Sequence, residues 1–310
     1  MLRRTFLWLS EHSGVFNFVK RNRLARRIAS RFVAGETLDS AIAAAHAMNA
    51  KGIAVSLDLL GESVSSAVET KAARDQVVRT IDAIAAESVN GNVSVKLTQL
   101  GLAIGYDLCA ENMRAVLTCA KERNVFVRMD MEGSAYTERT LKLFHEELHP
   151  TFGDLTGVVI QSYLRRSDRD IEDLIVKRAR VRLCKGAYAE PASVALQDKR
   201  EVDASFVRLM QKLLEHGAYP GIATHDEALI DQAVAFVKER GIPPERFEFQ
   251  MLYGVRRDLQ RGLRARGYNM RVYIPFGTAW YPYLMRRLAE RPANLAFMVG
   301  SVLKETVRRR

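Results

Sequence analysis

Eight short runs rich in β-branched and aromatic residues alternate with longer amphipathic stretches along this chain. The expected strands span 52–59, 93–97, 125–131, 157–162, 181–184, 221–224, 247–252 and 271–275. Helical patterns are expected at 66–88, 110–122, 137–148, 168–178, 203–216, 227–240, 255–266 and 279–290. Because consecutive parallel strands need a crossover connection, this order predicts a (βα)8 TIM-like barrel with an N-terminal helical segment.

The chain reads as one structural domain, because no Pro/Gly/Ser-rich linker interrupts it. Residues 1–50 are expected to form a helical cap, residues 51–292 the barrel, and residues 293–310 a C-terminal helix with a basic tail. An open doubly wound sheet is the alternative fold. It is disfavoured because no strand is followed by a GxGxxG turn.

The formal net charge of +11 favours an anionic partner, such as a membrane surface, a nucleic acid or a phosphate-bearing ligand. No zinc-finger spacing or RNP-like aromatic pattern supports nucleic acid, so we expect none to bind, and a basic nucleic-acid-binding protein stays a lower alternative. Cys109, Cys119 and Cys184 are odd in number and widely spaced, which is typical of thiols in a reducing cytoplasm. We expect a cytoplasmic protein that contacts the inner face of the cell membrane peripherally.

Polar residues stand near the end of nearly every expected strand, where a barrel of this kind places its catalytic groups. They are Asp58, Lys96, Asp130, Glu132, Gln161, Arg182, Lys185, Thr224, His225, Gln250 and Tyr273. We expect the active site at this end of the barrel. His225 has no HxxxH or HxH partner, so no metal site is expected.

Lys96 lies at the end of an apolar strand, where a charge is costly unless it is paired or solvated. We expect it within reach of an acid such as Asp130 or of an anionic ligand. A structural ion pair and a Schiff-base lysine of an aldolase-like enzyme both fit the pattern. The second role requires a depressed pKa, and the sequence leaves the choice open.

The last expected helix carries Tyr283, Arg286, Arg287 and Glu290 at the i, i+3, i+4, i+7 spacing of one helical face. On a solvated helix these residues would form ordinary ion pairs. Two adjacent arginines repel each other, however, and binding a carboxylate or phosphate would offset that repulsion. An anionic small molecule is therefore favoured as ligand.

Six motifs, in this order, resemble the proline dehydrogenase family of the monofunctional bacterial type and the equivalent domain of the bifunctional proline utilization A enzymes. They are Val-Lys-Leu-Thr around Lys96, Val-Ile-Gln ending at Gln161, Arg-Leu-Cys-Lys-Gly-Ala-Tyr at 182–188, Ala-Thr-His at 223–225, Glu-Phe-Gln-Met-Leu-Tyr-Gly at 248–254 and Tyr-x-x-Arg-Arg-x-x-Glu ending at Glu290. The resemblance covers about residues 59–294.

The resemblance implies FAD-dependent oxidation of L-proline to Δ1-pyrroline-5-carboxylate by hydride transfer to flavin N5. That reaction is the first step of proline degradation to glutamate. The resemblance also implies reoxidation by a membrane quinone and a separate pyrroline-5-carboxylate dehydrogenase that takes the product. Because a flavin accepts the hydride, no side chain has to act as a nucleophile.

The resemblance also assigns roles to residues of the substrate site. It implies that Lys96, Arg286 and Arg287 hold the proline carboxylate and that Asp130 organises them. Glu290 would pair with the arginines. The residues implied to wall the pyrrolidine ring are Tyr188, Leu252, Tyr273 and Tyr283. The catalytic set implied is Lys96, Asp130, Arg182, Tyr273, Arg286 and Arg287.

For the cofactor, the resemblance implies Arg182 near N5 and Gln161 hydrogen-bonded to the isoalloxazine. Further implied contacts are Cys184, Lys185, Gly186, Thr224, His225 and Gln250. One departure is visible: many relatives continue Gly-Ala-Tyr with tryptophan, whereas this chain has Ala189. Stacking near the adenine is expected to differ.

Overall fold

The computed structural model describes the backbone of residues 30–61 and 64–290, and the side chains of those residues as far as Met285. The expectations for residues 1–29 and 293–310 lie outside the described residues. Within the described part, no helix is long and apolar enough to span a membrane.

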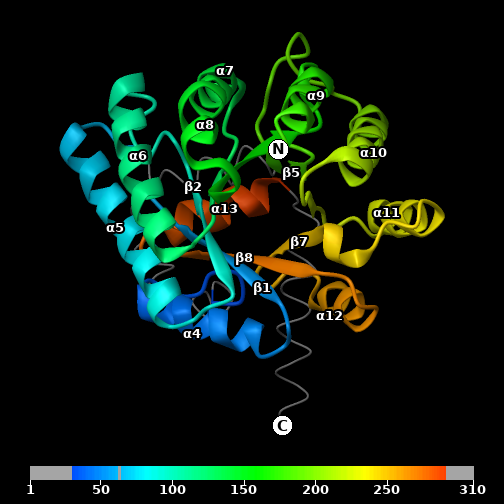
Figure 1. Ribbon diagram of the computed structural model, residues 1–310, viewed down its shortest axis with the longest axis horizontal. Helices are drawn as coiled ribbons and strands as arrows, with labels where there is room; N and C mark the ends of the chain where they lie inside the picture. Colours follow the sequence, from blue (N-terminus) through cyan, green and yellow to red (C-terminus); the bar gives the residue numbers. More distant parts are fainter. Residues whose placement is uncertain (1–29, 62–63, 291–310) are drawn as a thin grey trace.

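Eight parallel strands close into a barrel in sequence order, which confirms the predicted fold (Figure 1). They are β1 Ala54–Leu59, β2 Gly91–Val95, β3 Val127–Met129, β4 Thr156–Gln161, β5 Arg180–Cys184, β6 Gly221–Ala223, β7 Glu248–Leu252 and β8 Met270–Phe276. The barrel closes through β1 and β8, which pair in parallel from Ala54 opposite Arg271 to Leu59 opposite Phe276.

Helices cover the outside of the barrel between successive strands. They are α5 Ala67–Ala86, α6 Tyr106–Arg123, α7 Ser134–Leu143, α8 His149–Phe152, α9 Ser167–Val176, α10 Lys199–His216, α11 Glu227–Glu239 and α12 Arg257–Ala265. Local signals set several starts: Ser66 and Glu69 form a capping box at α5, and the Asp198 side chain accepts two backbone N–H bonds at α10.

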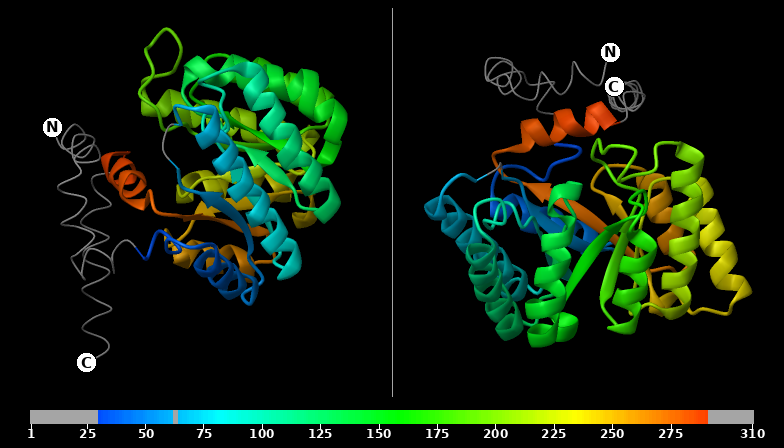
Figure 2. Two further views of the ribbon diagram at one scale, coloured as in Figure 1. Left: turned by 90° about the vertical axis from the view of Figure 1, so that its left-hand side faces the viewer. Right: turned by 90° about the horizontal axis from the view of Figure 1, so that it is seen from above.

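The helices before β1 and after β8 depart from a simple barrel. Helix α4 (Leu38–Asn49) buries Ala41, Ile42, Ala45 and Met48 in the barrel core and packs against β1 and β8. Helix α13 (Trp280–Glu290) lies apart from the ring of helices (Figure 2). The sequence pattern had grouped 279–290 with the crossover helices. Because α4 already covers the seam between β8 and β1, α13 packs elsewhere.

The inside of the barrel is polar, although barrels of this class are usually filled by branched aliphatic side chains. In β1, Val55 and Leu57 belong to the hydrophobic core, while the alternate residues Ser56 and Asp58 hydrogen-bond to the side chains of Asn92 in β2 and of Lys96 just after it. The other strands add further interior polar groups: Ser94, Arg128, Asp130, Arg182, Glu248, Gln250, Arg271 and Tyr273. Burying so many polar and charged groups is costly unless they serve a function, so the barrel interior is a candidate functional site.

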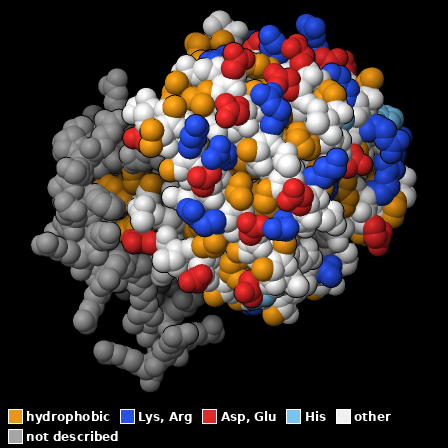
Figure 3. Space-filling model, turned by 60° about the vertical axis from the view of Figure 1, so that its left-hand side comes forward, with side chains coloured by type: hydrophobic (Ala, Val, Ile, Leu, Met, Phe, Trp, Pro, Cys, Tyr) orange, Lys and Arg blue, Asp and Glu red, His pale blue; other side chains and the backbone are white. Residues whose placement is uncertain are grey.

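The outer surface is mixed in charge. Figure 3 shows Lys and Arg side chains interspersed with Asp and Glu and with scattered hydrophobic groups on one face. Exposed ion pairs such as Arg123–Asp82 bridge neighbouring helices, and pairs of this kind contribute only about 0–1 kcal/mol each to stability. The charged groups that matter most for a functional site are therefore those buried inside the barrel.

Candidate functional site

Four side chains from adjacent strands meet at the carboxyl end of the barrel. Lys96 Nζ lies 2.7 Å from Asp58 Oδ1 and 3.7 Å from Asp130 Oδ2. Tyr273 OH donates a 2.6 Å hydrogen bond to Asp130 Oδ2, and Lys96 Nζ donates to Tyr273 OH at 3.4 Å. The structure thus brings together Lys96, Asp130 and Tyr273, as predicted, and adds Asp58 as the nearest partner of the lysine.

Electrostatics fix the protonation states of this cluster. Burial disfavours the charged form of Lys96, but Asp58 and Asp130 outweigh burial and raise the lysine pKa above its ordinary value. Burial, followed by the charges of Asp130 and Asp58, raises the pKa of Tyr273 well above 10.0. At neutral pH the cluster therefore holds an ammonium cation and a neutral phenol that donates to a carboxylate.

Arg182 lies one layer deeper and ties the cluster to the barrel interior. Its NH1 donates to Asp130 Oδ1 at 2.8 Å, its NH2 donates to Ser94 Oγ at 3.1 Å, and its Nε donates to Gln250 Oε1. The guanidinium carbon is 5.2 Å from the centre of the Tyr273 ring. Asp130 therefore accepts from Arg182 on one oxygen and from Tyr273 on the other.

A second buried network supports Arg182 from below. Gln250 Nε2 donates to Glu248 Oε1 at 2.6 Å, and Arg271 Nε donates to the same oxygen at 2.7 Å. Burial raises the pKa of Glu248, but the charge of Arg271 and the hydrogen bonds it accepts outweigh burial and hold the pKa below its ordinary value. Sequence reasoning missed Glu248 and Arg271. Polar residues at every second position of β7 and β8 were the available signal.

At the end of β4, Gln161 Nε2 donates a 2.9 Å hydrogen bond to the backbone oxygen of Glu132. The Glu132 carboxylate accepts from Thr98 N at 3.0 Å and from Thr98 Oγ1 at 2.5 Å. Burial raises the pKa of Glu132, and the Thr98 hydrogen bonds act in the opposite direction. Gln161 is thereby held at the mouth of the barrel by the segment that follows β3.

The predicted cofactor residues Cys184, Lys185 and Gly186 span the last residue of β5 and the loop that follows it. Lys185 Nζ lies 2.5 Å from Asp203 Oδ1 and 3.0 Å from Asp226 Oδ2. Gly186 has a φ of +115°, and a Cβ there would lie 2.3 Å from the ring of Tyr163. This turn therefore requires glycine.

The ends of β6 and β7 are joined through the imidazole of His225. Leu252 N donates a 2.9 Å hydrogen bond to His225 Nε2, and Asp226 N donates to the buried Thr224 at Oγ1, 3.1 Å away. Since Nε2 accepts here, a neutral His225 carries its proton on Nδ1. Thr224, His225 and Leu252 are thus brought to one rim of the mouth.

Several groups at the ends of β4 to β7 could hold a flavin dinucleotide. They are the amide of Gln161, which donates to Glu132 O, the imidazole of His225, the ammonium of Lys185, which is paired with Asp203 and Asp226, and the backbone of the tight turn at Gly186. Amide and imidazole donors suit the polar edge of an isoalloxazine, and cations with exposed backbone N–H groups suit a pyrophosphate. Gln250 and Arg182 lie deeper, within the interior network.

The predicted residues of α13 divide into two groups. Tyr283 is buried in a hydrophobic cluster with Trp280 and Leu60. Arg286, Arg287 and Glu290 lie on the helix, as predicted, and their side chains are outside the described residues. Tyr188 lies on the rim, 44% exposed, and lines a pocket together with Glu132 and Tyr136.

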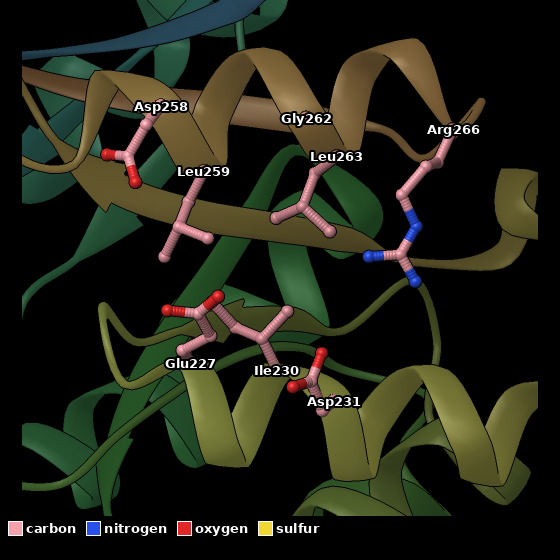
Figure 4. Close-up of a pocket in the computed structure, with 8 residues that line it drawn as sticks. All are labelled: Glu227, Ile230, Asp231, Asp258, Leu259, Gly262, Leu263 and Arg266. Carbon is pink, nitrogen blue, oxygen red and sulfur yellow. The ribbon is translucent and has the colours of Figure 1, made fainter.

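A different pocket lies between α11 and α12, and Figure 4 shows its lining side chains on the two facing helices. The lining residues are Glu227, Ile230, Asp231, Asp258, Leu259, Gly262, Leu263 and Arg266. None of the predicted site residues lines it. Across residues 30–61 and 64–285, no group of three or more His, Cys, Asp or Glu side chains could hold a metal ion.

Comparison with known proteins assigns the chain to a family. The family model described as proline dehydrogenase matches residues 41–299. Proline dehydrogenase 1 of Bacillus subtilis strain 168 is 41% identical over 307 residues, covering 98% of this chain and 100% of that protein. The proline dehydrogenase of Deinococcus radiodurans is 42% identical over 311 residues, covering 98% of each.

A solved structure agrees with these matches. Proline utilization A of Bdellovibrio bacteriovorus, inactivated by N-propargylglycine, superposes with a TM-score of 0.85 at 26% identity, covering 97% of this chain and 38% of that one. Sequence matches of this length and identity, together with the closed barrel and its polar mouth, lead to one conclusion. The chain belongs to the proline dehydrogenase family.

Proposed function

We propose that this protein oxidises L-proline to Δ1-pyrroline-5-carboxylate with FAD as its cofactor. The observation that carries the proposal is the joined cluster of Asp58, Lys96, Asp130, Tyr273 and Arg182 at the mouth of a barrel of this family. The cluster supplies fixed charges and hydrogen-bond donors but no activated nucleophile. Such a site suits a reaction in which the protein binds and orients its substrate.

The substrate would be held at its two polar ends. Arg286 and Arg287 of α13, together with the permanent cation of Lys96, would bind the carboxylate of proline. The pyrrolidine ring would be bordered by Tyr188, Leu252, Tyr273 and Tyr283. Glu290 would pair with Arg286 and Arg287. The Tyr273 ring is held in place from both sides, by its bond to Asp130 and by the guanidinium of Arg182.

When bound, a flavin supplies an acceptor for the hydride that leaves the ring carbon next to nitrogen. The residues that would hold the flavin are Gln161, Arg182, Cys184, Lys185, Gly186, Thr224, His225 and Gln250. The barrel contributes rigidity: Arg182 makes hydrogen bonds to side chains from three other strands and to Asp130 just after β3, so its position is fixed before the substrate binds.

An aldolase-like lyase that uses Lys96 is disfavoured by the same cluster. A Schiff-base lysine must lose its proton to act as a nucleophile. Lys96 is paired with two carboxylates, which raise its pKa. Borohydride treatment with substrate should therefore trap no adduct at Lys96.

For the electron acceptor we propose a membrane quinone, reached by peripheral contact of a cytoplasmic protein with the inner face of the cell membrane. The net charge of +11 supports attraction to anionic lipid. A separate pyrroline-5-carboxylate dehydrogenase would take the product. Flotation with anionic vesicles at low salt, together with quinone reduction by proline, tests this proposal. Failure to bind vesicles and to reduce quinone would contradict it.

The first experiment is an anaerobic visible spectrum of the purified protein before and after L-proline is added. Flavin bands that bleach with L-proline, and not with D-proline or L-alanine, would support both the cofactor and the substrate. A colourless protein that stays inert after FAD is supplied would overturn the proposal.

A further inference from the structure

The segment from Ala34 to Glu36 runs beside the end of β8 and the start of α13. Ala34 N donates to Pro275 O at 2.9 Å, and Gly277 N donates to Gly35 O at 3.0 Å. Further along, Trp280 Nε1 donates to Glu36 Oε1 at 2.9 Å. Residue numbers rise together on the two sides, so the two segments lie parallel, and the contacts end at the first residue of α13.

The packing of α13 depends on this same segment. Trp280, Tyr283 and Leu284 form a hydrophobic cluster with Val33 and Leu60 that is separate from the barrel core. Figure 2 shows α13 beside the first described residues and apart from the ring of helices. Among the residues that the structure describes, α13 is therefore held by a small local cluster and by the segment around Glu36.

The turn that leads into α13 adds little restraint of its own. Gly277 has a φ of +122°, and a Cβ there would lie 3.0 Å from the backbone oxygen of Leu60. Glycine is required in this conformation, so position 277 carries no side chain that could fix the direction of the helix. The next directional contact along the chain is the hydrogen bond of Trp280 with Glu36.

We propose that Glu36 is a positioning residue for the substrate site. By fixing Trp280 at the first turn of α13, its carboxylate sets the direction of the helix that carries Arg286 and Arg287. This inference rests on the proposed function, in which those arginines bind the substrate carboxylate. A small rotation at the first turn is enlarged along the 11 residues of α13, so one hydrogen bond there changes how well the arginines meet a ligand.

The test uses the FAD-loaded enzyme and four substitutions. Glu36→Ala removes the acceptor, Glu36→Gln keeps an acceptor oxygen without the charge, and Trp280→Phe removes the donor. Asp39→Ala is the matched control, because Asp39 is an exposed acid three residues away on the first turn of α4. Glu36 is itself exposed, so its replacement leaves the barrel core intact.

We expect Glu36→Ala and Trp280→Phe each to raise the KM for L-proline about fivefold, with kcat changed less than about twofold. The double variant should lose clearly less than the sum of the two single losses, because both variants remove the same hydrogen bond, although Trp280→Phe also reduces packing in the cluster around α13. Glu36→Gln should recover most of the affinity. Without turnover, the Kd of cyclopentanecarboxylate, measured by its perturbation of the flavin spectrum, should rise by the same factor.

The inference is overturned if Glu36→Ala matches Asp39→Ala in KM and in the Kd of cyclopentanecarboxylate. It is also overturned if Glu36→Gln is as impaired as Glu36→Ala, or if the two single effects add. Failure of the proposed function is a separate outcome, since wild-type protein would then fail to bleach with L-proline before any variant is compared.

Discussion

Lys96 and Asp58 form a 2.7 Å ion pair in which the acid is 1% exposed and the amine 29% exposed. Asp58 thus anchors the ammonium from inside the barrel, while Lys96 reaches the mouth. Breaking a buried pair from one side leaves an uncompensated charge, which typically costs about 3–5 kcal/mol. Since Lys96 is partly solvated, we expect the Asp58→Asn variant to lose stability near the lower end of that range.

The same variant should lose activity, because Lys96 would turn toward Asp130 and compete there with Arg182 and Tyr273. We expect kcat/KM for L-proline to fall at least about tenfold, as for loss of one charge-assisted contact. Urea unfolding and steady-state kinetics measure the two effects. Asp82→Asn, which breaks the exposed pair with Arg123, is the control and should cost under about 1 kcal/mol. Equal losses in the two variants would contradict the anchoring role.

Replacing Tyr273 with Phe removes the hydroxyl that donates to Asp130 and keeps the ring over Arg182. We expect kcat/KM to fall about tenfold with FAD retained, because a hydrogen bond to a charged group is worth about 1.5–3 kcal/mol. The raised pKa of Tyr273 keeps its phenol protonated at pH 10, so the wild-type rate should show no tyrosine ionisation below that pH. Tyr219→Phe makes the same change at the other end of the barrel and should keep full activity.

Much of this fold could be predicted, because eight β-rich runs in alternation with helical patterns leave few other architectures. Strand ends were less accurate. The run expected at 125–131 forms strand only over Val127–Met129, the residues that pair with β2 and β4. The place where α13 packs could not be predicted either. Its spacing indicates a helix, but its partner is set by α4, which fills the seam between β8 and β1.

The mouth was easier to predict than the interior. Lys96, Asp130 and Tyr273 stand near strand ends, where polar residues indicate a site. Glu248 and Arg271 lie deeper in parallel strands, which usually read as apolar runs, so an isolated charge there looks like a strand boundary. Only the closed barrel shows that the two side chains face each other.

Replacing Glu248 with Gln should destabilise the barrel by about 3–5 kcal/mol, since Arg271 and Arg128 would lose the acid that offsets their charges. The pKa of Glu248 is held below its ordinary value of 4.5, so its stabilising effect is present above that pH and is lost as the pH falls through the folded-state pKa. The difference in unfolding free energy between wild type and variant should therefore shrink below pH 4.5. Glu245→Gln, on the exposed 3-10 turn Pro244–Arg246, is the control and should show no such trend.

Removing either arginine of α13 should separate substrate binding from cofactor binding. Arg286→Met and Arg287→Met keep an unbranched apolar stem and delete the charged fork, so each should raise the KM for L-proline by about 10- to 100-fold, the loss expected for a charge-assisted contact. The residues proposed to hold the flavin stand at the ends of β4 to β7, remote in sequence from α13, so the visible spectrum should keep its full flavin content. Arg261→Met on the exposed side of α12 is the matched control and should leave KM unchanged. Loss of flavin at constant KM would instead assign the two arginines to the cofactor.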